Sequence, residues 1–223
     1  MKKLLLKIVM ILSIASLFYS CYPNDSIKIK DLDTTTTVYE PNDFNPAPKS
    51  AVIYWNVAQL KGDDDDDLPY RGEIDSEILN TTLDNMVDLY GVENVYIYSN
   101  TANPSPTPSN SAVEIRTPSD SRPSVDVGII PSIILRRNTQ VGIIYPPCIP
   151  GWWYWYCYPP VINISTYDVG TILLNMVDLR QNNNDDPSWI AIMRGLLSSD
   201  NTYNGDRTVS GIDKAFEQSP YLN

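Results

Sequence analysis

Apart from a leader at its N-terminus, this chain keeps its apolar residues in short runs separated by segments rich in proline, asparagine and aspartate. The runs are rich in β-branched and aromatic residues, which is typical of strands. They are residues 51–57, 92–99, 125–135, 139–145, 161–165 and 169–179, with a further short strand near Thr36–Tyr39. We expect 125–135 and 139–145 to form a hairpin, in which Pro131 favours an edge or a bulge. The pattern therefore predicts a sheet of short strands.

Two other segments repeat their apolar residues at steps of three and four, which predicts helices over about 73–90 and 206–219. Acidic residues begin the first helix and Gly91 follows it, which suits the helix dipole and a C-terminal stop. Pro220 ends the second. Residues 188–198 fit either a helix or a strand. The sum is an α+β fold, an antiparallel sheet with two helices packed on one face.

The first twenty residues have the order of a bacterial signal peptide. Lysines precede an apolar core, and Ser20 stands directly before Cys21. The core is shorter than the roughly 20 residues needed to span a bilayer. A small residue before a cysteine resembles the cleavage site of lipoproteins, after which Cys21 would be acylated, as with palmitate, and would begin the mature chain. The alternative is an ordinary secretory signal with an incidental cysteine.

These features predict three regions: a lipoprotein signal peptide at 1–20, a lipid-anchored polar tether at 21–48 and a single α+β domain at 49–223. Within the domain, residues 99–124 are rich in Pro and Ser, and we expect an exposed loop that does not pack. The mature protein would lie in the Gram-negative cell envelope, held to a membrane by its N-terminal lipid. The outer membrane is favoured, with its periplasmic and surface faces both open.

The composition excludes several classes of function. The chain has no histidine, which removes Ser-His-Asp triads, His-ligated zinc and His-ligated haem. Its net charge is −11, and loss of the leader's three lysines would leave 13 basic against 27 acidic residues, so we predict no nucleic-acid partner. P-loop, dinucleotide, nucleophile-elbow and C-x-x-C motifs are missing. We therefore predict no catalytic residue, cofactor or metal.

Acidic residues leave two alternatives open. The run Asp63–Asp67 does not match an EF-hand loop, because Leu68 and Ile74 would occupy its sixth and twelfth positions. A solvated acidic loop is thus favoured over a weak calcium site. A carboxylate-dependent hydrolase acting on envelope glycans is the second alternative, and it requires a deep cleft with two facing carboxyl groups. Asp178, at the end of a predicted strand, is interpreted as a turn or capping residue.

The candidate site is the aromatic segment YPPCIPGWWYWYCYPP at 145–160. We expect Cys148 and Cys157 to form a disulfide in an oxidising compartment, because their spacing suits neither a redox dithiol nor a zinc site. Closing about ten residues should stabilise the fold by roughly 2.5–3 kcal/mol. Six residues could bind a ligand: Trp152, Trp153, Tyr154, Trp155, Tyr156 and Tyr158.

Rigid aromatic side chains suit a glycan, a proline-rich peptide or the surface of an envelope protein. Trp and Tyr also favour the membrane interface. The alternative is that half of these aromatic side chains turn inward and close the end of the sheet. The function predicted from the sequence is a non-catalytic binding or scaffolding domain of the envelope. A purely structural part of an assembly is a third possibility, beside the hydrolase.

Several motifs resemble the envelope lipoprotein family called domain of unknown function 4136. In that family a strand that begins with Gly-Thr and ends with Val-Asp is followed by a strand with Trp and Gly, and then by a C-terminal helix before a proline. The matching residues are the Cys21 leader, Asp43-Phe44, Gly170-Thr171, Val177-Asp178, Trp189, Gly195 and Pro220. The resemblance covers roughly 44–222 and implies that 188–198 is a strand paired with 169–179. No catalytic residues are established for the family, so none is carried over.

Overall fold

The structure is a computed structural model that describes residues 33–60, 70–121, 124–135, 149–151, 154–156, 170–180, 187–195 and 201–222. Residues Asp33–Asn223 form one compact unit, and Met1–Leu32 form another that lies outside the described residues. The predicted signal peptide, Cys21 and most of the tether therefore lie outside them too. So do the Asp63–Asp67 run and the predicted strands at 139–145 and 161–165.

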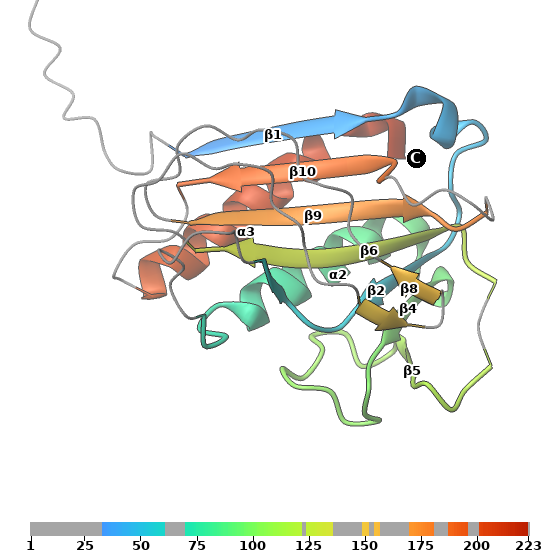
Figure 1. Cartoon of the computed structure of the whole chain (residues 1–223). Coiled ribbons are helices and arrows are strands. Elements are labelled where there is room, and N and C mark those ends of the chain that lie inside the picture. Colours follow the sequence, from blue (N-terminus) through green and yellow to red (C-terminus); the bar gives the residue numbers. More distant parts are fainter. Residues whose placement is uncertain are drawn as a thin grey trace, which may run out of the picture. The chain divides into compact units, whose positions relative to one another are not determined.

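The main sheet has eight strands, and the two longest, β6 and β9, lie next to each other at its centre (Figure 1). The strands are β1 (Thr34–Tyr39), β2 (Ala51–Tyr54), β3 (Ala58–Leu60), β4 (Val95–Tyr98), β5 (Glu114–Arg116), β6 (Val127–Ile134), β9 (Thr171–Asp178) and β10 (Trp189–Arg194). Their order is β1-β10-β9-β6-β2-β4-β5, and β3 also pairs with β6. A separate two-stranded sheet consists of β7 (Ile149–Gly151) and β8 (Tyr154–Tyr156).

Within the described residues, two α-helices and three short 3-10 helices complete the fold. The α-helices are α2 (Asp75–Tyr90) and α3 (Asn201–Glu217), and the 3-10 helices are η2 (Pro41–Phe44), η3 (Val92–Asn94) and η4 (Pro220–Leu222). Figure 1 shows α2 and α3 together behind the sheet. The α+β class is thus confirmed, and the strand implied for 188–198 by the family resemblance is β10, which pairs antiparallel with β9.

The prediction of an antiparallel sheet is only partly right, because the sheet is mixed. The pairs β1–β10, β10–β9 and β9–β6 are antiparallel, whereas β2–β4, β2–β6, β3–β6 and β4–β5 are parallel. The chain leaves β2 and β3, passes through α2 on one face of the sheet and returns as β4 beside β2. A crossover through a helix brings the returning strand in parallel.

The surroundings of Pro131 differ from the prediction. It lies in β6, a central strand, with Leu174 of β9 opposite it. On the other side, β2 pairs with Val127–Ile129 and β3 pairs with Ser132–Ile134, so the interruption between β2 and β3 falls beside Pro131. A residue without an N–H fits best where the neighbouring ladder is broken. The edge expectation is wrong, and so is the hairpin with 139–145, because other strands occupy both sides of β6.

The main core lies between the sheet and the helices. From the sheet it takes alternate residues of β2, β4, β6, β9 and β10, and from the helices it takes the apolar stripe that the sequence predicts. Its fully buried members include Ile53, Ile97, Ile129, Leu174, Trp189, Ile78, Leu83, Met86 and Ile212. A smaller cluster lies on the other face and contains Val52, Tyr54, Tyr98, Val125, Ile130 and Val177.

The segment 99–121, expected not to pack, is attached to the domain at several points. The indole Nε1–H of Trp55 donates to the Pro106 carbonyl at 2.6 Å, and Trp55 itself is buried. Ser109 bonds two side chains of α2, through its N–H at 2.7 Å and its hydroxyl at 2.9 Å. Val113 is buried and β5 follows it directly. Polar side chains and backbone groups thus hold a segment that has few apolar residues to bury.

Candidate functional site

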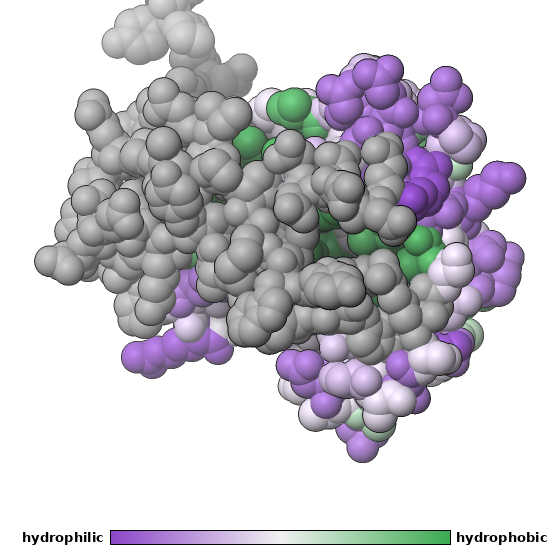
Figure 2. Space-filling view, turned by 45° about the vertical axis from the view of Figure 1, so that its right-hand side comes forward, coloured by the Kyte–Doolittle hydropathy of each residue, from purple (hydrophilic) through white to green (hydrophobic). Residues whose placement is uncertain are grey.

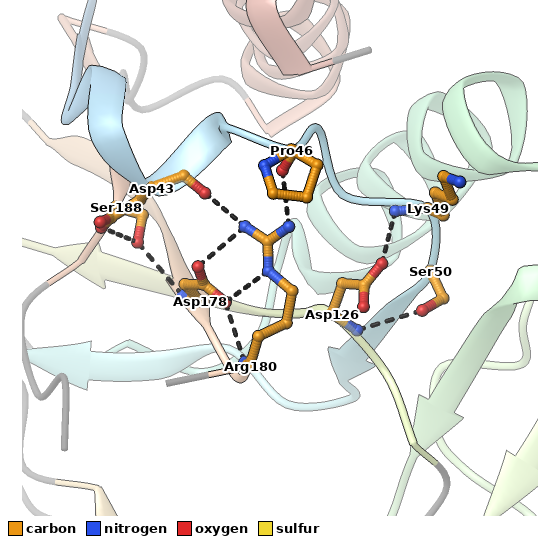
Figure 3. Close-up of polar contacts among 8 residues, drawn as sticks. All are labelled: Asp43, Pro46, Lys49, Ser50, Asp126, Asp178, Arg180 and Ser188. Atoms are coloured by element: carbon orange, nitrogen blue, oxygen red, sulfur yellow. Dashed lines mark hydrogen bonds and ion pairs between the residues drawn. The ribbon is translucent and has the colours of Figure 1, made fainter. Parts of the chain in front are cut away.

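A buried polar cluster lies where β9 ends and β10 begins (Figure 3). The guanidinium of Arg180 donates from Nε to Asp178 Oδ1 at 2.9 Å and from one terminal nitrogen to Asp178 Oδ2 at 2.8 Å. The other terminal nitrogen donates to the Pro46 carbonyl at 2.6 Å, and the nitrogen that bonds Asp178 Oδ2 also donates to the Asp43 carbonyl. This is a two-pronged ion pair with two additional carbonyl acceptors. The hydrogen bond from Arg180 to the Asp178 carboxylate raises the pKa of Arg180, so the guanidinium stays charged.

Asp43 and Ser188 extend this cluster across the start of the domain. The Ser188 hydroxyl donates to Asp43 Oδ2 at 2.6 Å and accepts the Asp178 N–H at 3.2 Å. Both Asp178 and Ser188 are almost fully buried. The contacts link residues 43–46, which follow β1, to the ends of β9 and β10. We call the set Asp43, Asp178, Arg180 and Ser188 the latch.

A second link lies beside the latch. The Lys49 N–H donates to Asp126 Oδ2 at 2.7 Å, and the Asp126 N–H donates to the Ser50 hydroxyl at 3.1 Å. The Asp126 carbonyl accepts the N–H of Leu179 at 2.7 Å. These bonds align the starts of β2 and β6 with the end of β9. In each of these bonds the donor is a backbone N–H group, which is typical of the residues at the ends of strands.

The latch is structural in its chemistry. A hydrolase needs two carboxyl groups that face a substrate, one able to donate a proton. Here the Asp178 carboxylate is held by both prongs of Arg180, and the Asp43 carboxylate accepts from Ser188. Asp178 does take the predicted turn role, because its Oδ1 accepts the Arg180 N–H at 2.9 Å. Asp43 belongs to the Asp43-Phe44 motif of the family resemblance, but the sequence does not indicate Ser188, 145 positions away, as its partner.

The C-terminal motif of the family resemblance also serves packing. Trp189 is fully buried and donates from Nε1 to the Ser219 hydroxyl at 2.9 Å. That hydroxyl in turn donates to the Ala215 carbonyl at 2.8 Å, and the Trp189 ring lies 5.4 Å from that of Phe216. Tyr221 stacks on Tyr39 with ring centroids 3.6 Å apart. These contacts hold the C-terminal end of α3 and η4 against β10 and β1.

The predicted aromatic site is described only in part. Backbone residues of β7 and β8 pair antiparallel, with Ile149 opposite Tyr156, Pro150 opposite Trp155 and Gly151 opposite Tyr154. Of the six candidate binding residues, Tyr154, Trp155 and Tyr156 therefore lie in β8. The residues Trp152, Trp153 and Tyr158, and both cysteines, lie outside the described residues. Within the described strands, this hairpin pairs with no strand of the main sheet.

Tyrosines line the sheet face opposite the helices. The rings of Tyr54 and Tyr98 stack with centroids 5.9 Å apart, and burial raises the pKa of both. The guanidinium of Arg116 lies 5.7 Å from the ring of Tyr96 and pairs with Glu114 at 2.7 Å. Figure 2 shows a patch of apolar residues with hydrophilic residues beside it. Tyr54 and Tyr98 are themselves buried, so these two rings serve packing.

The described residues contain neither a cluster of metal ligands nor a membrane-spanning helix. No group of three or more Asp, Glu or Cys among them could hold a metal ion. No helix in the described part of the chain is both long and apolar enough to cross a membrane.

Comparisons with known proteins identify the family. The family model described as Domain of unknown function (DUF4136) matches residues 79–221. Among solved structures, a DUF4136 family protein from Bacteroides thetaiotaomicron VPI-5482 is similar at 16% identity and a TM-score of 0.48, over 86% of this chain and 97% of that one. Two structures of the PelC dodecamer from Paraburkholderia phytofirmans align over the same shares at 10% identity, with TM-scores of 0.36 and 0.34. No curated protein matches. Because the family model covers more than half of the sequence, as the motifs predicted, the chain belongs to the DUF4136 family.

Proposed function

We propose that this protein is a non-catalytic binding or scaffolding domain, anchored in the Gram-negative envelope through a lipid on Cys21. It would bind a glycan or an envelope protein through the loop Trp152–Tyr158. The observation that carries the proposal is the separate β7–β8 sheet, which among the described strands pairs only with itself. A segment that pairs with itself is free to present its residues, whereas a strand inside the main sheet would use them for packing.

The strand register supports a disulfide at the base of this hairpin. In β7 and β8, Gly151 lies opposite Tyr154 nearest to the turn. The next pair is Pro150 with Trp155, and the pair furthest from the turn is Ile149 with Tyr156. One more step in the same register reaches Cys148 and Cys157. Opposed residues of an antiparallel pair have Cα atoms about 4.5–5.5 Å apart, which fits the range of disulfides. A bridge there would hold the loop in one shape and reduce the entropy lost on binding.

The hydrolase alternative has less support. The most deeply buried carboxylates of the described residues, Asp43 and Asp178, are held by Ser188 and Arg180 inside the latch. Asp33 is likewise paired with the buried Arg207. Carboxylates that are held in this way are not free to exchange protons with a substrate.

Tryptophan fluorescence tests the proposal. The protein would be titrated with peptidoglycan fragments, envelope polysaccharide and proline-rich envelope peptides. We expect a saturable change with one of these ligands, and its loss when Trp152, Trp153 and Trp155 are all replaced by Ser. The control is Trp55→Phe, which removes a buried indole elsewhere and should leave the titration unchanged. A response that persists in the triple variant, or no response to any of the three, would contradict the proposal.

A further inference from the structure

One outer edge of the main sheet is the six-residue strand β1 (Figure 1). Its sequence is TTTTVY, with high β-propensity and no charge or proline. Natural edge strands usually carry a lysine, a proline or a bulge that prevents pairing with another chain. The β1–β10 ladder runs from Thr34 to Tyr39 without interruption. This edge therefore lacks the usual protection.

The edge also exposes apolar side chains. The described part of the chain has three large hydrophobic residues that are exposed, and two of them, Val38 at 56% and Tyr39 at 41%, lie at the end of β1. Thr34 and Thr36 are exposed as well. The rest of β1 is firmly held, because Thr35 donates to the Gly211 carbonyl of α3 at 3.5 Å. A rigid and uncharged edge with exposed apolar ends is suited to a partner strand.

The alternation of bonded and non-bonded pairs between β1 and β10 shows which backbone groups of β1 face away from β10. Glu40 donates its N–H to the Ser188 carbonyl at 2.9 Å, and this pair continues the β1–β10 register. Antiparallel pairs alternate between bonded and non-bonded, so Thr34, Thr36 and Val38 also point their backbone groups toward β10. The bond from Gly195 N–H to the Gly170 carbonyl agrees, since it directs odd-numbered residues of β10 toward β9. The odd-numbered residues Thr35, Thr37 and Tyr39 therefore present their N–H and C=O groups to the free edge.

These three residues are complementary to a second copy of themselves. A two-fold axis at Thr37 would place Thr37 opposite its own mate, Thr35 opposite Tyr39, and Thr36 opposite Val38. All three free positions would then be bonded on both chains, giving about six hydrogen bonds between the copies. Val38 would be covered by a β-branched neighbour. Two-fold pairing of one surface with itself is the commonest way in which identical chains associate.

The charges near the edge also fit this register. Glu40 would lie opposite Thr34, and Asp33 would lie opposite Pro41, so no two acids face each other. Asp33 is in addition neutralised by Arg207 of its own chain. The excess of acidic residues over the whole chain would repel a second copy at many other places. The β1 strand itself carries no charge, which permits a close approach.

We propose that two copies of this protein associate through β1, antiparallel and with the two-fold axis at Thr37, to form one continuous sheet across the dimer. The partner is a second copy of this chain. The helices α3 of both copies would lie on the same face of that sheet. This inference is independent of the aromatic loop.

Cysteine cross-linking of the full-length protein in membranes tests the register. In the proposed dimer the two Thr37 Cα atoms lie about 5.5 Å apart, within the range of a disulfide. Mates of Thr36 would be offset by two residues and lie about 8 Å apart, beyond that range. Thr37→Cys should therefore give a dimer band on a non-reducing gel, and Thr36→Cys several-fold less. The wild-type chain, treated in the same way, shows the background from the native cysteines.

Proline substitutions separate association from folding. Thr37→Pro removes an N–H that faces the free edge and leaves the bonds to β10 in place. We expect the detergent-purified wild type to sediment as a dimer and Thr37→Pro as a monomer, with an unchanged circular dichroism spectrum. A wild type that is monomeric, a dimer that survives Thr37→Pro, or equal cross-linking at Thr36 and Thr37 would each overturn the proposal. A monomer that binds a different envelope protein at β1 would overturn it too.

Discussion

The ion pair of the latch has two unequal members. The side chain of Asp178 is 2% exposed, whereas that of Arg180 is 24% exposed. A carboxylate left without its partner in the interior keeps its full desolvation cost, but a half-buried guanidinium can turn toward water. At the scale of single residues, the burial of the group that remains therefore decides the cost of breaking this pair.

This asymmetry gives a prediction for two alanine variants. Arg180→Ala should lower the free energy of unfolding by about 3 kcal/mol, and Asp178→Ala by about half of that. Urea denaturation, followed by tryptophan fluorescence, measures both. An equal loss, or a larger loss for Asp178→Ala, would show that the burial of the remaining partner does not decide the loss of stability. Asp88→Ala, on the exposed side of α2, serves as the control for a generic loss of an acid.

Asp75 makes a prediction about pH. Burial raises the pKa of its carboxyl group, and the hydrogen bond from Tyr70 at 2.6 Å opposes that rise. A folded-state pKa above the unfolded value of 3.8 gives a stabilising contribution that is complete below pH 3.8 and is lost as pH rises through the folded value. Relative to Asp75→Asn, the wild type should therefore become less stable from about pH 3.5 to neutrality. Chemical denaturation of both proteins across this range tests it, and a flat or rising difference would refute the assignment.

At the scale of secondary-structure elements, the β7–β8 hairpin predicts a disulfide between the two cysteines that flank it. Its register makes Cys148 and Cys157 the next opposed positions. Non-reducing peptide mapping should find them bridged in protein from the envelope. Replacing both by Ser should lower the free energy of unfolding by roughly 2.5–3 kcal/mol, and reduction of the wild type should have the same effect. Free thiols at both positions would contradict the hairpin base that we propose.

The two helices show how far the sequence predicts an element. The apolar stripe of α2 is continuous, and its predicted span of 73–90 differs from Asp75–Tyr90 only at the start. The first turn of α3 was missed, because Asn201–Gly205 has no apolar repeat. In the structure that turn packs on α2, where a Cβ added at Gly205 would lie 3.5 Å from the side chain of Glu77. A contact between distant segments stabilises this turn, and local patterns do not report such contacts.

The sheet and the latch also differ in how far the sequence predicts them. The strand–helix–strand order of 51–99 indicates parallel pairing of β2 and β4. The prediction of an antiparallel sheet does not take this order into account. The latch had no comparable signal, because Asp43 and Ser188 meet only once β1, β9 and β10 are in place. The family motifs at Asp178 and Trp189 are explained by burial and packing, and they mark the fold of the family.

At the scale of the whole molecule, an ion pair holds the first residue of the described domain. Asp33 is paired with Arg207 of α3, and it lies twelve positions after Cys21. A fully extended tether of that length would reach about 40 Å. A lipid on Cys21 would therefore keep the domain, and its aromatic loop, close to one membrane surface. The acidic balance of the mature chain would hold it off anionic lipid and leave the loop available to a ligand.

The central claim is that the anchored domain binds an envelope component through Trp152–Tyr158. The most direct measurement is affinity capture from intact envelopes with two proteins, the wild type and the variant in which Trp152, Trp153 and Trp155 are Ser. Both should fractionate with the membrane and show the same unfolding midpoint. The account predicts that a glycan or protein retained by the wild type is lost with the triple variant. Retention of the same components by both proteins would contradict it.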